Sequence, residues 1–179
     1  NLKVDKYATI CFGTNRYSAP DNLVGQTLFV KIYSEWIDIY HSSGIVGRHS
    51  RAYDRNGWQI DLNHYLTTLA RKPGALAHSV ALKQAPQWIK TIYTDHFTKE
   101  SKSFIELLQY CQGHDIDDDR LQSTVDKLFK LRPENVTAGN IMALLGNQPQ
   151  EDVVRRSEPD PIAVQSLSNL LEFSRMMLN

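Results

Sequence analysis

Basic and aromatic side chains alternate on consecutive segments that are predicted to be β-strands. Lys31 lies among apolar residues in Thr27–Tyr33, and Arg48 and Arg51 lie in Ile45–Arg51. Guanidinium and ammonium groups bind nucleic-acid phosphates with little sequence preference. The same pattern also fits ordinary solvated strand residues. Both interpretations apply to the full candidate set of Arg16, Tyr17, Lys31, Tyr33, Tyr40, Arg48, Arg51 and Arg55.

Four short segments are predicted to be the strands that position these side chains. In the clearest one, Leu28, Val30 and Ile32 fall on one face, and the residues between them fall on the other. Short turns link the later segments as hairpins, which favours a small closed or half-open β-barrel. The segments are Tyr7–Phe12, Thr27–Tyr33, Trp36–His41 and Ile45–Arg51, with a further extended stretch at Arg16–Ser18.

A short helix with a defined end is predicted where the β pattern gives way to helical spacing. Its apolar residues, at spacings of three and four, are Leu62, Tyr65, Leu66 and Leu69. Arg71 and Lys72 lie in the last turn, where cations suit the negative end of the helix dipole. Pro73-Gly74 then prevents continuation. The two cations therefore have a structural explanation, and contact with phosphates is the alternative.

Two motifs resemble sequences of one transposase family. Tyr65–Leu76 reads Tyr-x-x-x-Leu-Ala-Arg-Lys-Pro-Gly-Ala-Leu, and Asn15–Pro20 is similar to a Tyr-Ser-Val-Pro signature, with Ala19 in place of the valine. Both resemble motifs of IstA-type transposases, which are encoded by two-gene bacterial insertion sequences related to phage Mu. The resemblance covers roughly residues 4–112.

The resemblance implies a small β-barrel that lies along double-stranded DNA, placed just after a catalytic domain that this chain lacks. DDE-type, Mg²⁺-dependent catalysis would belong to that absent domain, and the chain itself would need no cofactor. The resemblance also implies a helper ATPase of the IstB type, from the AAA+ class, as a partner. Self-association is implied for the full-length protein.

Helical spacing dominates the chain after Pro73-Gly74. The predicted helices cover about 75–84, 86–97, 101–112, 118–131 and 137–145. Asp117 and Thr137 are predicted to cap two of them, and Gly146 to close the last. The predicted fold class is β followed by α, with a barrel over 1–58 and a helical domain over 59–146.

The predicted tail consists of a flexible linker and an amphipathic helix. Residues 147–161 combine prolines and charges with little apolar content, which is typical of linkers. Residues 162–179 recover helical spacing, and this helix either folds back on the chain or docks on a partner protein. The predicted partner-binding residues are Arg155, Arg156, Val164, Leu167, Leu170, Leu171 and Leu178.

The chain has 179 residues and no formal net charge, but its charge is unevenly distributed. Residues 1–100 hold 12 Lys/Arg against 8 Asp/Glu, and residues 101–179 hold 8 against 12. This asymmetry favours a front that faces nucleic acid and a back that faces protein. The missing initial Met suggests a fragment. The two cysteines have no metal-ligand spacing and are expected to be buried thiols. No signal peptide or membrane-spanning segment is visible in the sequence. These features fit a bacterial cytoplasmic protein.

Candidate catalytic and metal-binding groups have simpler explanations. Asp38 and Asp54 are expected to be solvated strand and loop residues. Asp115, Asp117 and Asp119 resemble a calcium loop only superficially, because Arg120 stands where that loop needs glycine, so helix capping is favoured. Only His41 and His49 are placed to face each other across a hairpin, and metal binding there is disfavoured.

The sequence thus predicts a non-catalytic C-terminal part of a DNA transposase. It would bind element-end DNA, support assembly of the transposase multimer and receive the helper ATPase. The alternative is a protein-interaction module that never contacts DNA. The predicted DNA-binding residues are Arg16, Tyr17, Lys31, Arg48, Arg51, Arg55, Arg71 and Lys72.

Overall fold

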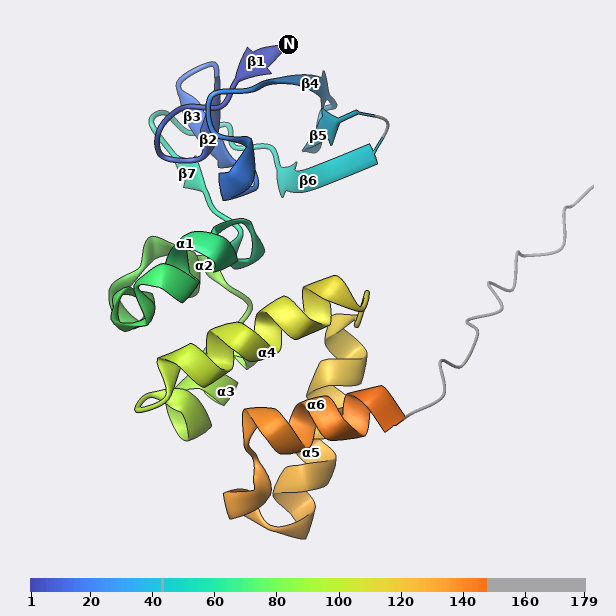
Figure 1. Ribbon diagram of the computed structural model, residues 1–179. Coiled ribbons are helices and arrows are strands. Elements are labelled where there is room, and N and C mark those ends of the chain that lie inside the picture. The colour runs from blue at the N-terminus through green and yellow to red at the C-terminus, as the bar shows by residue number, and fades with distance from the viewer. Residues whose placement is uncertain (43, 148–179) are drawn as a thin grey trace, which may run out of the picture. The chain divides into compact units, whose positions relative to one another are not determined.

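The computed structural model describes residues 1–42 and 44–147, in which β-strands precede helices (Figure 1). This order confirms the predicted β-then-α class. Residues 1–147 form one compact unit. Asn147 closes the last described helix, and the rest of the predicted linker, the predicted helix at 162–179 and all seven predicted partner-binding residues lie outside the described residues. The predicted boundary near residue 58 stays a prediction.

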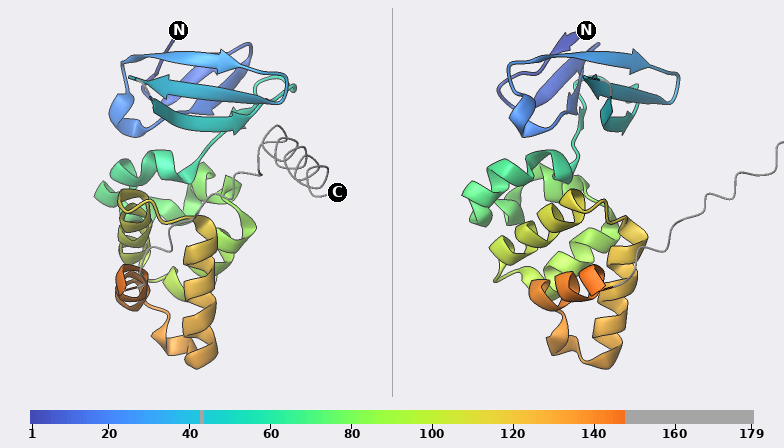
Figure 2. Two further views of the ribbon diagram at one scale, coloured as in Figure 1. Left: turned by 90° about the vertical axis from the view of Figure 1, so that its right-hand side faces the viewer. Right: turned by 45° about the vertical axis from the view of Figure 1, so that its right-hand side comes forward.

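The described strands form two sheets. The larger sheet is antiparallel, in the order β1 (Leu2–Lys3), β4 (Thr27–Ile32), β5 (Trp36–His41) and β6 (Gly44–Ser50). The smaller sheet has the order β2 (Thr9–Phe12), β3 (Asn15–Ser18) and β7 (Trp58–Gln59), with β3 and β7 parallel. Within the described residues these sheets are not joined into one closed sheet, so the closed barrel stays a prediction. Figure 2 shows β4, β5 and β6 side by side.

Alternation along the strands separates a core face from an outer face, as expected for a pleated strand. Leu28 of β4 and Ile37 and Ile39 of β5 are buried, and their neighbours in sequence point to the other side. Ile32, predicted to face inward, is exposed at the end of β4. The β core is small, and its buried residues are Val4, Ile10, Tyr17, Ala19, Leu23, Leu28, Ile37 and Ile39.

The helical region consists of short helices and single turns around a larger apolar core. The α-helices are α1 (Leu66–Arg71), α2 (Val80–Gln84), α3 (Gln87–Ile92), α4 (Ser101–Gly113), α5 (Asp118–Leu131) and α6 (Ala138–Asn147). Single-turn elements lie between them and in the β region: η1 (Asp21–Leu23), η2 (Leu62–Tyr65), η3 (Pro73–His78), η4 (Tyr93–Phe97) and η5 (Pro133–Asn135). The longest helix but one, α4, buries the stripe that its apolar periodicity predicted, which is Phe104, Leu107, Leu108 and Cys111. In α5, Leu121, Val125 and Leu128 of the predicted stripe are buried, but Phe129, its fourth member, is 50% exposed.

Local sequence explains where these helices begin and end. The Asp117 carboxylate accepts a hydrogen bond from the Arg120 N–H at 2.7 Å, which confirms the predicted N-cap of α5. Thr137 likewise accepts from the Asn140 N–H at 3.3 Å. Gly146 lies inside α6 rather than after it, so the predicted stop there was wrong. The predicted helix at 75–84 is divided, because the Ser79 hydroxyl caps α2 by accepting from the Leu82 N–H at 3.0 Å.

No helix within residues 1–42 and 44–147 is long and apolar enough to cross a membrane.

Candidate nucleic-acid interface

The outward side of the larger sheet gathers cations and aromatic rings. We call it the outer sheet face and define it by Phe29, Lys31, Tyr33, Trp36, Asp38, Tyr40 and Arg48. Strand register places Lys31 beside Asp38 and Asp38 beside Arg48, so one charged row crosses the three strands. Phe29 pairs with Tyr40 on one side of this row, and Tyr33 and Trp36 lie on the other.

Asp38 was predicted to be solvated, and the structure corrects this. Its side chain is only 2% exposed, and the Arg48 guanidinium, itself exposed, donates from Nε to Oδ1 at 2.6 Å and from Nη2 to Oδ2 at 2.9 Å. Hydrogen bonds and charge from Arg48 hold the pKa of the Asp38 carboxyl below its usual value, against the opposing effect of burial. The bidentate pair fixes Arg48 while leaving the rest of its fork facing outward.

Lys31 and the aromatic rings fill the remainder of the outer sheet face. The Lys31 ammonium lies 5.0 Å from the centre of the Tyr40 ring, a cation–π contact. Tyr33 and Trp36 have ring centres 5.0 Å apart, and Phe29 and Tyr40 have centres 5.9 Å apart. Lys31, Tyr33 and Phe29 are exposed, so both a charge and flat apolar surface are presented outward.

Arg51 extends this surface past the end of β6. Its guanidinium donates from Nη1 to the Tyr33 carbonyl at 3.0 Å and lies 5.0 Å from the Tyr53 ring centre and 5.6 Å from that of Phe12. The Tyr53 hydroxyl in turn donates to the Ser34 carbonyl, which ties this loop to the β4–β5 turn. The structure thus places Lys31 and Arg48 on the outer sheet face and Arg51 at its edge, and their contact with DNA stays a prediction.

The structure places Tyr17 and Arg16 differently from the prediction. Tyr17 is 0% exposed, and its hydroxyl accepts from the Ala52 N–H at 3.0 Å, so it is a core residue and is not on the predicted surface. Arg16 is half-buried, forms an ion pair with Asp5 and lies 5.0 Å from the Trp58 ring centre. Burial of Asp5 works against its charge, but hydrogen bonds from the backbone N–H groups of Thr9 and Tyr7, and from Arg16, outweigh burial and lower its pKa.

The remaining predicted cations do not join the outer sheet face. Arg55 is exposed in the connection between β6 and β7. Arg71 and Lys72 are exposed at the end of α1, in the helical region. Contact of these three residues with DNA stays a prediction.

A polar junction that sequence reasoning missed joins the β region to η2. The Val46 carbonyl can only accept, so His64 Nε2 donates to it at 3.1 Å, and in the neutral ring Nδ1 accepts from the Ser18 hydroxyl, 2.8 Å away. The Ser18 hydroxyl oxygen also accepts from the Asp61 N–H at 2.9 Å. His49 Nε2 donates to the Ser18 carbonyl at 2.7 Å. The prediction that His41 and His49 face each other was wrong, because His49 instead lies against His64, with ring centres 5.5 Å apart.

Burial keeps both histidines of this junction neutral. Loss of hydration lowers the pKa of His49 and of His64, and it outweighs the opposing effects of Asp61 and the backbone carbonyls. One sequence signal pointed to the junction. An isolated glycine inside a strand often marks a close approach by another group, and a Cβ on Gly47 would lie 2.9 Å from His64 Cε1.

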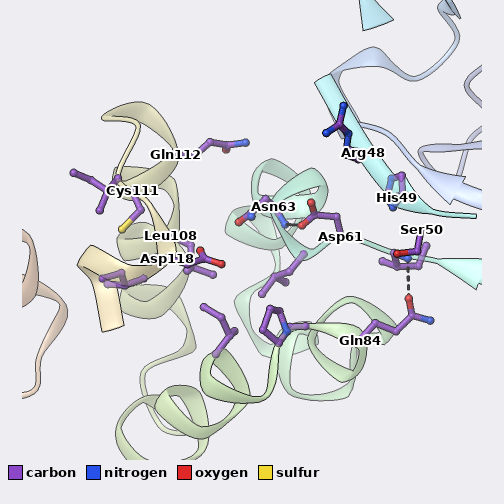
Figure 3. A pocket seen from close by; sticks show the side chains of 17 residues that line it. Arg48, His49, Ser50, Asp61, Asn63, Gln84, Leu108, Cys111, Gln112 and Asp118 are labelled. Carbon is purple, nitrogen blue, oxygen red and sulfur yellow. Dashed lines mark hydrogen bonds between the residues drawn. The ribbon is translucent and has the colours of Figure 1, made fainter. Parts of the chain in front are cut away.

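A cleft lies between β6 and the helices, and it is acidic on one side. Its volume is about 550 Å³. Figure 3 shows Asp61 and Asp118 among its polar side chains and Cys111 on α4. Burial raises the pKa of Asp118, and the negative charge of Asp61 adds to this effect. Burial also raises the pKa of the Cys111 thiol to about 11, as predicted for a buried cysteine, whereas Cys11 is exposed, contrary to the prediction.

A second, apolar groove lies where β7 meets α1 and α2. Its volume is about 250 Å³. Tyr7, Trp58 and Val80 are its exposed apolar residues, and Ile60, Tyr65, Thr68, Leu69, Ser79 and Ala81 complete its lining. Among residues 1–42 and 44–147, no cluster of three or more His, Cys, Asp or Glu side chains is arranged to hold a metal ion.

Comparison with known proteins finds a similar domain family and similar transposases. Residues 1–61 match the Mu transposase C-terminal domain. A transposase of Aminobacter aminovorans is 28% identical over 138 residues, which make up 73% of this chain and 26% of that relative. The transposases for insertion sequences IS1326/IS1353 of Pseudomonas aeruginosa and Shigella flexneri are each 25% identical over 108 residues, or 56% of this chain and 21% of theirs.

The chain spans about a quarter, or less, of the length of these curated relatives. No solved structure matched it. The family match covers the two sheets that carry the outer sheet face, and the longer relative alignment extends into the helical region. Residues 1–61 are therefore similar to the Mu transposase C-terminal domain, and longer stretches of the chain are similar to parts of curated transposases.

Proposed function

We propose that this chain is a non-catalytic part of a DNA transposase that binds the DNA of the element ends through its outer sheet face. One observation carries the proposal: Lys31 and Arg48 flank Asp38 on the outer sheet face, and Arg51 bonds the Tyr33 carbonyl at the edge of this face, with exposed aromatic rings beside them. Such a surface binds phosphates in a salt-dependent and largely sequence-independent way.

Each cation has a distinct part in this proposal. Lys31 is exposed and rests over a ring rather than beside a carboxylate within hydrogen-bond distance, so its charge is available to a phosphate. Arg51 is held by a backbone carbonyl, which fixes its direction without neutralising its charge. Arg48 is neutralised by Asp38 but fixed in direction, so it supplies oriented donors rather than net charge.

The other surfaces are poorer candidates for DNA. The large cleft is lined by Arg48 of the outer sheet face, but also by the Asp61 and Asp118 carboxylates, and burial together with the charge of Asp61 raises the pKa of Asp118. A phosphate entering it would add a further negative charge. Arg16 is already engaged by Asp5.

The family resemblance supports two further parts of the proposal. A helper ATPase of the IstB type would dock on the chain, and the full-length protein would self-associate. The apolar groove at Tyr7, Trp58 and Val80 is the described surface best suited to a protein partner, because interface cores are apolar and rich in aromatic residues. The same groove favours the alternative function, a protein-interaction module without DNA contact.

The test is a fluorescence anisotropy titration of labelled duplex DNA with the full chain at low and moderate salt. We expect binding that weakens steeply with salt. A Lys31→Ala/Arg51→Ala double variant should bind more weakly and reduce the slope of log affinity against log salt by about 2, or about 1 for each lost phosphate contact. Arg48 is left intact, because removing it would strand the Asp38 carboxylate.

Lys102→Ala is the matched control, since Lys102 is an exposed cation on α4 with only an i,i+4 partner, Glu106. It should leave both the affinity and the salt slope unchanged. No duplex binding at low salt, or an equal loss in the Lys102 variant, would overturn DNA binding by the outer sheet face. Retained capture of the ATPase by a chain that binds no DNA would then favour the interaction module.

A further inference from the structure

The outer sheet face carries an aromatic–cation–aromatic stripe along β4 and the residue that follows it. Phe29, Lys31 and Tyr33 occupy alternate positions, so all three side chains point outward. Phe29 is 51% exposed and Tyr33 is 39% exposed. Rings this exposed contribute little to the core, whose β4 member is Leu28 on the opposite face.

Each exposed ring is supported from β5. Phe29 lies against Tyr40 across the strand pair, with ring centres 5.9 Å apart. Tyr33 lies against Trp36, with ring centres 5.0 Å apart and ring planes 31° from parallel. Each pair forms a small platform. The Lys31–Asp38–Arg48 row lies between the two platforms.

The dimensions of a strand set the spacing of this stripe. Residues two apart lie about 6.7 Å apart along a strand, so the backbones of Phe29 and Tyr33 are separated by about 13 Å, with Lys31 between them and its ammonium near the Tyr40 ring of one platform. Such a stripe offers a stacking surface, then a positive charge, then a second stacking surface. Along an unpaired nucleic-acid strand, bases and phosphates are available in a comparable alternation.

Regular duplex DNA cannot use the two platforms fully. In a duplex, neighbouring bases cover each other's faces, so a protein ring on a flat sheet reaches only sugars, phosphates and groove edges. An unpaired base exposes its face, and stacking it on an aromatic side chain strengthens binding by roughly 5- to 150-fold per base. The ring exposure is therefore better explained by unpaired bases than by phosphate contact alone.

We propose that the Phe29–Lys31–Tyr33 stripe stacks unpaired bases, so that the outer sheet face binds single-stranded or locally opened DNA more tightly than regular duplex. The inference rests on the proposed DNA-binding function and specifies the form of DNA that this surface takes. Phe29 and Tyr33 bind base faces, and Lys31 binds the phosphate between them.

The test compares two probes of equal phosphate number, an unpaired oligothymidine and a mixed-sequence duplex, titrated with the full chain by fluorescence anisotropy. We expect the unpaired probe to bind at least about 5-fold more tightly. Phe29→Leu and Tyr33→Leu should each weaken binding of the unpaired probe by about 5-fold or more and leave duplex affinity unchanged. Lys31→Ala should weaken binding of both probes.

Two controls separate stacking from folding. Phe29→Tyr keeps the ring and should restore binding of the unpaired probe. Phe129→Leu removes a ring that is 50% exposed on α5, away from the sheet, and should change neither affinity. Duplex binding equal to or tighter than unpaired binding, or equal losses for both probes in the leucine variants, would overturn the stacking inference and leave DNA binding standing. Absence of binding to either probe would overturn both.

Discussion

The helical and β regions are held together by different forces. The helical region has a large continuous apolar core, in which Phe104, Ile105 and Leu107 are fully buried. The β region has a far smaller apolar core and adds hydrogen bonds around Ser18, His49 and His64 to it. Because a small core supplies little stabilisation by itself, we infer that the β region depends on this junction while the helical region does not.

The largest expected effect comes from the same truncation made in each core. Leu107→Ala and Leu28→Ala should each lower the free energy of unfolding by about 2–5 kcal/mol, because each removes a fully buried side chain. Hydrogen exchange read region by region distinguishes them. Leu107→Ala should speed exchange in both regions, and Leu28→Ala should speed it mainly in the β region. Equal acceleration everywhere in both variants would show that the regions unfold as one.

Gly47→Ala tests the junction itself. The new Cβ would lie 2.9 Å from His64 Cε1 and 3.2 Å from Nε2, so His64 must move and lose hydrogen bonds to Ser18 and Val46. We expect a loss of about 1–3 kcal/mol in urea unfolding. Gly74→Ala, where no atom lies within 4 Å of the added carbon, is the matched control and should be close to neutral. If Gly47→Ala leaves the free energy of unfolding unchanged, the junction rearranges around the new Cβ without destabilising the fold.

Asp38→Asn tests the ion pair on the outer sheet face. The change removes a charged acceptor that is covered by its neighbours, but its Arg48 partner is exposed and can be hydrated, so the loss should be only about 1–2 kcal/mol. A double-mutant cycle with Arg48→Met isolates the pair. A coupling energy near zero in that cycle would show that the two side chains do not stabilise each other.

The smallest expected effect is the pH dependence of stability. The folded-state pKa values of His49 and His64 lie below the ordinary value of 6.5, so the unfolded chain binds more protons as the pH falls. Stability should therefore be lost below about pH 6.5, by at most about 1.4 kcal/mol per pH unit for each histidine, until the folded-state values are reached. Asp61 and Asp21 near His64 oppose this loss.

Urea unfolding across this range is the measurement, and His64→Gln should flatten the slope. Asp38 affects stability in a separate pH range. Its pKa is lowered in the folded state, so the stability that its ionised form provides is lost only as the pH falls below about 3.8, its ordinary value. If the free energy of unfolding stays constant from pH 7 down to the folded-state pKa values of the two histidines, the pair is not buried in the neutral form.

Patterns within one element were predictable from sequence, whereas pairings between distant elements were not. Alternation predicted the strand at 36–41 and helical periodicity the helix at 118–131, and β5 and α5 have these bounds in the structure. Tyr17 and Asp38 were misplaced because burial depends on which element covers a face. Alternation put Asp38 correctly on the outer face, but it did not reveal that Arg48 would cover it. Ser18 and His64 are 46 residues apart, and no local pattern connects them.

The parallel pairing of β3 with β7 has a consequence for how the chain is made. Local hairpins such as β4–β5 can form as soon as their residues leave the ribosome, but β3 must wait for a strand that follows β6. The junction waits longer still, for His64. The β region thus begins before the helical region but is completed only after its last partner, His64, has been made. Until Trp58–Gln59 has been made, the edge of β3 that receives β7 is open, and during that interval the nascent domain is exposed to mispairing with other strands.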